Sequence, residues 1–294
     1  MTGRALPEAT IDPLLKREID ALASTFVSIE DAETTALTSD IVAPLREDQR
    51  WTEFCGLVTS TIGSRGYIVL RGLDADEGRS LLIVSRALGT TFGTYGPGRI
   101  VKRFRMSPWA DGLSHTLRAG DFHTDGNVSR DPPAGTAMQC EVEDPGAPKY
   151  AEQRVAYLPD ILERLLSGSP DDRAAYAFLT ATEAAMASET SPGVWRGHLV
   201  QDGVIRYHPQ SLRIAAKRLK QDPTEIESGI AAIHRASMDV SVPFHTRPGD
   251  TVLVSNRFAL HYRGECSVRF IKFPTEFEAR SLLVLHMKDQ SAAQ

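Results

Sequence analysis

A histidine and an aspartate stand two positions apart in the segment DFHTDGN, as His123 and Asp125. Side chains at positions i and i+2 of a strand point to the same face, so this imidazole and this carboxylate converge. They are two of the three ligands of a 2-His-1-carboxylate triad, which leaves positions open on a non-haem Fe(II) ion. Both side chains could instead be satisfied in a turn beside Gly126. The spacing alone therefore indicates a metal site but does not establish it.

A second candidate site lies far along the chain, in the segment PGDTVLVSNRFALHYRGE. It places His261 just after an apolar run that opens with a Pro-Gly-Asp turn, which predicts a strand. A double-stranded β-helix can bring two such distant segments together inside one barrel, so His261 could share a metal with His123 and Asp125. The remaining histidines have no comparable context and are interpreted as surface or core residues, with His208 in IRYHPQS the least certain among them.

The elements that must position these residues follow from changes in the hydrophobic period along the chain. Helical spacing of apolar residues predicts helices at 46–63, 76–89, 158–168, 171–188 and 223–238. Extended runs bounded by Gly and Pro predict strands at 66–73, 99–108, 135–146, 197–208, 248–256 and 280–287. Strands before and after a helical block predict an α+β fold with a mainly antiparallel β core that carries helices.

Composition is that of an ordinary globular protein. The 294 residues are 41% hydrophobic and 24% charged, which is enough apolar material for a sizeable core. No Pro-, Gly- or Ser-rich stretch separates two hydrophobic blocks, so we expect one domain over residues 1–294, with a helical insertion at about 151–200. The 38 acidic residues outnumber the 33 basic ones, and the net charge of −5 argues against a chain devoted to binding nucleic acid or an anionic membrane.

The sequence also bears on location and redox state. Its amino terminus has no apolar stretch suited to a signal peptide, and no window approaches the ~20 apolar residues of a membrane span, so a cytoplasmic protein is expected. Cys55, Cys140 and Cys266 lie far apart without CxxC spacing. We interpret them as reduced and mostly buried thiols.

Several segments, in this order, resemble the taurine dioxygenase and clavaminate synthase family of Fe(II)- and 2-oxoglutarate-dependent oxygenases. The resemblance is carried by GYIVLRGL, LGTTFG, FHTDGNVSRDPPAG, the CEVEDPG strand and turn, VIRYHPQSLR and PGDTVLVSNRFALHYR. It implies a double-stranded β-helix, the jelly-roll or cupin-like core, with flanking helices and a helical insertion. It also implies that His123, Asp125 and His261 hold Fe(II).

The resemblance further implies an activity. With 2-oxoglutarate and O2 as cosubstrates, such an enzyme oxidises an unactivated C–H bond of a small-molecule substrate while 2-oxoglutarate is converted to succinate and CO2. Because Asp125 fills the position that a halide would need, hydroxylation is favoured over halogenation. Desaturation, epoxidation and cyclisation stay open as alternatives, as do the substrate and the oligomeric state.

The family also places an arginine on the last core strand, against the distal carboxylate of 2-oxoglutarate, a contact suited to a planar guanidinium. Arg280, which opens RSLLVLHM, is the best match, provided that an insertion around FIKFPTEFE separates it from His261. Arg269 lies nearer to His261 and is the alternative. Its setting in GECSVRFIKF, however, resembles the segment before the last strand.

The chain departs from the family pattern at two places. DPGAPKYAEQ has no threonine where the family often supplies one to the cosubstrate, so that contact is replaced or absent. Position 284 is Val, where members that act on amino acids or sulfonates often carry a second arginine. Lys102, Arg103, Arg105 and Arg118 could hold an anionic substrate, or could simply belong to a solvated strand edge.

Two other classes of function stay open at this point. A zinc hydrolase could use the same two histidines and aspartate with a metal-bound water, and would need neither Arg280 nor 2-oxoglutarate. A non-catalytic β-barrel protein could bind a ligand and keep the three residues for structural reasons. Neither alternative would consume oxygen.

Overall fold

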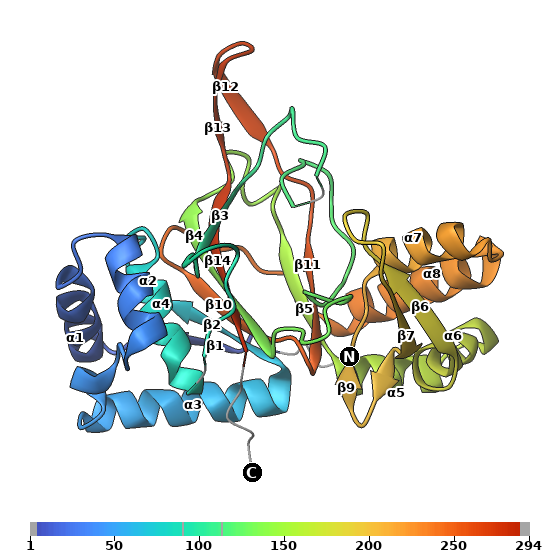
Figure 1. The fold of residues 1–294 in the computed structure, drawn as a ribbon, viewed down its shortest axis with the longest axis horizontal. Coiled ribbons are helices and arrows are strands. Elements are labelled where there is room, and N and C mark those ends of the chain that lie inside the picture. Colours follow the sequence, from blue (N-terminus) through green and yellow to red (C-terminus); the bar gives the residue numbers. More distant parts are fainter. Residues whose placement is uncertain (1–4, 90, 113, 289–294) are drawn as a thin grey trace.

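The computed structural model describes residues 5–89, 91–112 and 114–288 and has a large twisted sheet at its centre (Figure 1). Its strands run in the order β1-β2-β10-β4-β14-β3. Their bounds are β1 Glu8–Thr10, β2 Tyr67–Arg71, β10 Thr251–Ser255, β4 Gly135–Val142, β14 Ser281–Met287 and β3 Lys102–Arg105. Strand β1 is parallel to β2, and every other neighbouring pair is antiparallel. The expected mainly antiparallel β core is therefore present.

A smaller sheet carries His261. Strand β5 (Gln153–Tyr157) pairs with β11 (Ala259–Arg263) in antiparallel register, and His261 lies opposite Val155. His123 joins this sheet through an isolated bridge, in which the backbone N–H of each of His123 and His261 donates to the carbonyl of the other at 3.1 Å. Backbone hydrogen bonds thus place the HTD segment against β11, although the pairing does not extend beyond this one bridge.

The amino-terminal helices cover the outer face of the large sheet (Figure 1). They are α1 Pro13–Ser24, α2 Ile29–Thr38, α3 Gln49–Arg65 and α4 Arg79–Ser85, with short 3-10 helices η1 Ala43–Leu45 and η2 Arg86–Leu88. Val58 of α3 and Leu82 of α4 belong to the same buried cluster as Leu285 of β14. The helices predicted at 46–63 and 76–89 are therefore present, as α3 and as α4 followed by η2.

Helix α3 begins and ends where the sequence signals it. The Asp48 carboxylate caps the helix by accepting the backbone N–H of Arg50. Gly66 ends it with a φ of 80°, a conformation that glycine adopts without a steric penalty. A Cβ at Gly66 would lie 2.8 Å from the Cβ of Ala259, so glycine also allows the chain to pass close to β11.

A second helical group packs beside β5 and β11. It comprises α5 Leu158–Leu166, α6 Pro170–Thr180, α7 Pro209–Leu219 and α8 Pro223–Val240, with two small hairpins, β6 Glu183–Ala187 with β7 Val194–His198 and β8 Val200–Gln201 with β9 Val204–Ile205. Ile161 of α5 and Ile233 of α8 share a buried cluster with Leu260 of β11. The stretch expected as a helical insertion, about 151–200, begins with β5 and holds α5, α6 and the β6–β7 hairpin, and the helix predicted at 223–238 is present as α8.

Two predicted elements in this region are wrong. The helix predicted at 171–188 ends at Thr180, and the alanine-rich run that follows forms strand β6. Pairing with β7 and burial of Ala185 and Ala187 against Ala215 of α7 override the helical propensity of alanine. The strand predicted at 197–208 is divided between β7 and the short β8–β9 hairpin.

A hairpin lies between β11 and β14, formed by β12 (Val268–Lys272) and β13 (Glu276–Ala279). It extends away from the body of the molecule (Figure 1). This hairpin is the insertion that the placement of Arg280 on the last strand requires. Within the described ranges, none of the helices has the length and apolar character of a membrane span.

Candidate active site

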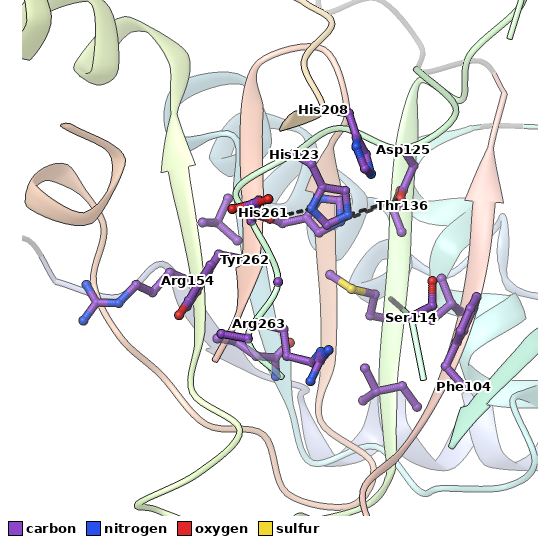
Figure 2. Close-up of a pocket in the computed structure, with 18 of the residues that line it drawn as sticks. Phe104, Ser114, His123, Asp125, Thr136, Arg154, His208, His261, Tyr262 and Arg263 are labelled. Atoms are coloured by element: carbon purple, nitrogen blue, oxygen red, sulfur yellow. Dashed lines mark hydrogen bonds and ion pairs between the residues drawn. The ribbon is translucent and has the colours of Figure 1, made fainter. Parts of the chain in front are cut away.

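A cavity of about 370 Å³ lies between the large sheet and the β5–β11 pair (Figure 2). Alternation along β14 turns Leu282, Val284 and His286 toward it, while the residues between them face the amino-terminal helices. His261 and Arg263 of β11 line the other side. Side chains from two distant parts of the chain therefore line one cavity.

His123, Asp125 and His261 lie together in this cavity. The His123 Nε2 atom is 3.8 Å from one carboxylate oxygen of Asp125, and the His261 Nε2 atom is 3.7 Å from the other. One possible ligand atom from each residue lies within 4.8 Å of the others. Ligand atoms that each stand about 2 Å from a shared ion are roughly 3–4 Å apart. The cluster thus has the donor types and nearly the spacing that Fe(II) requires.

Hydrogen bonds hold the imidazole of His123 and the backbone of Asp125 in place. The carbonyl of Asp121 lies 2.7 Å from Nδ1 of His123, so Nδ1 carries the proton and Nε2 keeps its lone pair for a metal. The Asn256 carboxamide accepts the backbone N–H of Asp125 at 2.7 Å and donates to the Asp125 carbonyl at 3.0 Å. Asn256 directly follows β10, so its side chain joins the segment of His123 and Asp125 to the segment that precedes His261.

The electrostatic setting suits a cation. Burial alone would raise the pKa of Asp125, but the neighbouring imidazoles of His261, His286 and His123 hold it well below its ordinary value. Burial and the neighbouring His123 lower the pKa of His261 to about 4, against the opposing effect of Asp125. At neutral pH the cluster therefore offers an ionised carboxylate and an uncharged His261, which are the protonation states that bind a metal.

Arg280 lies in the same cavity at the start of the last strand. Its side chain is 2% exposed, and within the described part of the chain neither terminal guanidinium nitrogen has a hydrogen-bond partner. Burial lowers the pKa of Arg280, yet a guanidinium stays charged in proteins. A buried, unpartnered cation is costly unless an anion joins it, so this position fits a bound carboxylate.

Arg269, the alternative anchor, is placed elsewhere. It lies on β12 of the projecting hairpin, its side chain is 69% exposed, and it forms an ion pair with Glu278 of β13. It does not line the cavity among the described residues. The structure therefore brings Arg280, and not Arg269, to the cavity of the His/Asp/His cluster.

Comparison with known families agrees with this geometry. The sequence model of the taurine catabolism dioxygenase TauD, TfdA family matches residues 44–269, which is most of the chain. The chain belongs to this family. It is therefore an Fe(II)- and 2-oxoglutarate-dependent dioxygenase, as the resemblance of its motifs implied. No curated protein sequence matches it.

Solved structures show the same fold for this TauD/TfdA-family dioxygenase. An asparagine oxygenase in complex with Fe(II), a hydroxyasparagine and succinate is 17% identical, with a TM-score of 0.69 over 96% of this chain and 94% of that one. The non-heme iron oxygenase OrfP, in complex with Fe and alpha-ketoglutaric acid, is 16% identical, with a TM-score of 0.68 over 97% and 95%. The fold is that of TauD-like Fe(II)/2-oxoglutarate oxygenases.

Two histidines of this dioxygenase's cavity were not predicted as site residues. The Nε2 atom of His286 lies 3.6 Å from Asp125, and the ring of His208 lies 5.1 Å from that of His123. Burial and the neighbouring His123 lower the pKa of His208 to about 3, so it is uncharged. A signal for His286 was present, because it lies an even number of positions after Arg280 on the same predicted strand. His208, the least certain of the histidines interpreted as surface or core residues, was singled out only by its place in VIRYHPQSLR, a segment of the family resemblance.

The departures from the family pattern can now be located. The segment that lacks a threonine ends at Gln153, which lines the cavity and donates from Nε2 to the Thr246 hydroxyl at 2.8 Å. Val284 also lines the cavity, and its cross-strand partner on β3 is Lys102. Of the four basic residues considered for an anionic substrate, only Lys102 belongs to the described cavity lining.

A hydroxyl group supports the carboxylate of the cluster. Thr136 of β4 is buried and donates from Oγ1 to one oxygen of Asp125 at 2.6 Å (Figure 2). Replacing Thr136 by valine keeps the shape but removes this donor, so we expect metal affinity to fall about 10-fold. Calorimetric titration with Co(II) as a redox-stable probe measures the effect.

Thr136→Ser serves as the matched control, because it keeps the hydroxyl and should bind Co(II) nearly as well as the unchanged protein. Thermal melting of both variants shows whether the fold is retained. A folded Thr136→Val protein with unaltered Co(II) affinity would show that the hydrogen bond does not position Asp125.

Proposed function

We propose that this dioxygenase hydroxylates an unactivated C–H bond of a small-molecule substrate bound in the cavity, while 2-oxoglutarate is decarboxylated to succinate and CO2. The observation that carries the proposal is the presence, in one cavity, of the His123/Asp125/His261 cluster and the unpartnered guanidinium of Arg280. A zinc hydrolase would need neither Arg280 nor 2-oxoglutarate, and a non-catalytic binding protein would not consume oxygen.

Each of these residues has a separate task in the proposal. His123, Asp125 and His261 hold Fe(II), and Arg280 binds the distal carboxylate of 2-oxoglutarate through two parallel hydrogen bonds. Once bound, the iron and its cosubstrates supply the oxidising chemistry. The chain fixes the donor atoms before binding: the Asp121 carbonyl sets the tautomer of His123, and Thr136 holds one oxygen of Asp125.

In this proposal the residues that line the cavity exclude water and position the substrate. Apolar side chains from the large sheet, including Met138, Leu282 and Val284, line the space beside the cluster. They exclude water from the reacting centre and aim one C–H bond of the substrate at the metal.

Asp125 occupies the position that a halide would need, which favours hydroxylation over halogenation.

We also propose that the large sheet and the β5–β11 pair are the two halves of a double-stranded β-helix. Both line the same cavity, and each is backed by its own group of helices. In this proposal the chain forms a single oxygenase domain, and the segment from α5 to α8 is inserted between β5 and β10. Asparagine and arginine derivatives occupy structural neighbours, which supports a small-molecule substrate.

The proposal is tested by measuring succinate formation with Fe(II), 2-oxoglutarate and O2 across a panel of candidate small molecules. We expect slow succinate formation without a substrate and a marked increase with a suitable one, together with a product heavier by one oxygen atom. Hydrolysis of a panel member that needs zinc, with no succinate formed under any condition, would overturn the proposal.

A further inference from the structure

We propose that His208 donates a hydrogen bond to the ligand that binds the metal from the cavity, at the position that 2-oxoglutarate leaves open. The inference rests on the proposed function, because it takes His123, Asp125 and His261 as the metal ligands. It gives His208 a contact with the bound ligand and not with the metal. Three observations carry it: the place of His208 beside His123, its tautomer, and a ring nitrogen that faces the cavity.

Backbone hydrogen bonds bring His208 to the cluster. Thr124, which lies between the two candidate ligands of the HTD segment, donates its backbone N–H to the carbonyl of Tyr207 at 2.7 Å. The Thr124 hydroxyl accepts the backbone N–H of Tyr207 at 3.0 Å. The residue after Tyr207 is therefore held beside His123, and the rings of His208 and His123 lie 5.1 Å apart in an edge-to-face arrangement.

An ion pair further along α7 ties the same helix to the same segment. Arg213 donates to the Asp121 carboxylate at 3.1 Å, and the Asp121 carbonyl is the group that orients the imidazole of His123. Arg213 also binds both carboxylate oxygens of Glu227 on α8, at 2.8 and 3.0 Å. His208, at the start of α7, is thus fixed relative to His123 before any ligand binds.

The helix also sets the tautomer of His208. His208 is the N-cap residue of α7, and its Nδ1 atom accepts the backbone N–H of Ser211 at 3.3 Å. An imidazole nitrogen that accepts a hydrogen bond uses a lone pair, so the proton of the uncharged ring is on the other nitrogen, Nε2. His208 therefore presents an N–H donor from Nε2.

This donor faces the cavity. The half-buried His208 side chain lines it together with the three candidate ligands. In Figure 2 the His208 ring points toward the side chains of His123 and Asp125. Within the described ranges, the hydrogen bond from Ser211 is the only one made by the His208 ring, so its Nε2–H is available to a ligand. A bound acceptor beside the cluster would complete the hydrogen bonding of the ring.

An uncharged donor is suited to this place. A cation there would repel the metal, whereas an N–H dipole stabilises negative charge that builds up on a bound ligand. The cap of α7 and the contacts of Thr124 hold the dipole in place, so it does not have to reorient when the ligand binds. His208 is therefore expected to strengthen the binding of the ligand without changing the affinity for the metal.

The experiment uses nitric oxide as the probe, because it binds Fe(II) at an open position and accepts a hydrogen bond. Anaerobic titration of the full protein with Fe(II), with and without saturating 2-oxoglutarate, gives its dissociation constant, and infrared spectroscopy gives its N–O stretching frequency. In His208→Asn the carboxamide should still cap α7 but is too short to reach the ligand. We expect nitric oxide to bind this variant about 3-fold to 10-fold more weakly and to show a higher stretching frequency.

His208→Gln is the matched control, because its carboxamide reaches the position of Nε2 but no longer caps the helix. This variant should keep most of the affinity for nitric oxide and should melt at a lower temperature than His208→Asn. Thermal stability and ligand affinity would then change in opposite directions in the two variants, which a purely structural role of His208 would not produce. Titration with Fe(II) alone should give the same metal affinity for both variants.

The outcomes separate this inference from the function on which it rests. If His208→Asn binds nitric oxide like the unchanged protein, with the same stretching frequency, the proposal is overturned and His208 serves only to cap α7. A change confined to the visible absorbance of the Fe(II)–2-oxoglutarate complex would also overturn it, because the contact would then be with the cosubstrate. Absence of that absorbance from the unchanged protein would count against the proposed function, while the titration without 2-oxoglutarate still tests His208.

Discussion

Replacement of Arg280 by alanine is expected to raise the apparent 2-oxoglutarate constant by about 30-fold or more, with metal binding little changed. The guanidinium is buried in the cavity, and its terminal nitrogens have no hydrogen-bond partner within the described ranges. The distal carboxylate of the cosubstrate supplies the missing partner, and its removal from water is tolerable only beside this cation. The measurement is the 2-oxoglutarate dependence of succinate formation at saturating Fe(II).

Two further variants make this result specific. Arg269→Ala should leave the constant unchanged, because Arg269 lies on the exposed β12–β13 hairpin with Glu278 as its partner. Arg280→Lys should recover only part of the affinity, since an ammonium cannot form the paired contact of a planar guanidinium. Loss of cosubstrate affinity in Arg269→Ala alone would mean that the anchor is on the hairpin and that the role of β14 is wrongly assigned.

Replacement of His261 by alanine is expected to abolish metal-dependent turnover and to lower metal affinity by more than about 100-fold. The loss of a supporting hydrogen-bond partner costs 10-fold to 100-fold, and the loss of a ligand removes more. The fold should survive, because β11 is held to β5 by its backbone and the imidazole faces the cavity. Metal titration and thermal melting of the same preparation separate the two effects.

His198→Ala provides the control for this variant. His198 is an exposed residue at the end of β7 and does not line the described cavity. The His198→Ala protein should therefore bind metal and turn over substrate like the unchanged protein. Wild-type metal affinity in His261→Ala would exclude His261 as a ligand and leave His286 or His208 as the residues to examine.

Local patterns predicted much of what positions the site. The spacing of His123 and Asp125 identified two donors that share the cavity, although His123 forms only an isolated bridge and Asp125 lies in a turn rather than on a strand. The Pro-Gly-Asp turn with the apolar run after it located the strand before His261, because this signal depends on a few neighbouring residues. The meeting of His123 with His261 depends on pairing between distant segments, which periodicity does not encode, so it came only from resemblance to a family.

The features that local patterns left open or predicted wrongly share a different cause. Strand alternation puts Lys102 and Phe104 on one face, but only the pairing of β3 with β14 decides that this face looks into the cavity. The alanine-rich run in β6 has a strong local preference for helix, which tertiary pairing with β7 overrides. Both cases depend on contacts between elements rather than within them.

Anaerobic titration of the protein with Fe(II) and 2-oxoglutarate shows whether one cavity holds the metal and the cosubstrate together. We expect a weak visible charge-transfer band that appears only when both are present and saturates at one equivalent per chain. The band should be absent from His261→Ala and should require a higher 2-oxoglutarate concentration in Arg280→Ala. A protein that binds Fe(II) through the three residues yet gives no band at any 2-oxoglutarate concentration would contradict the account.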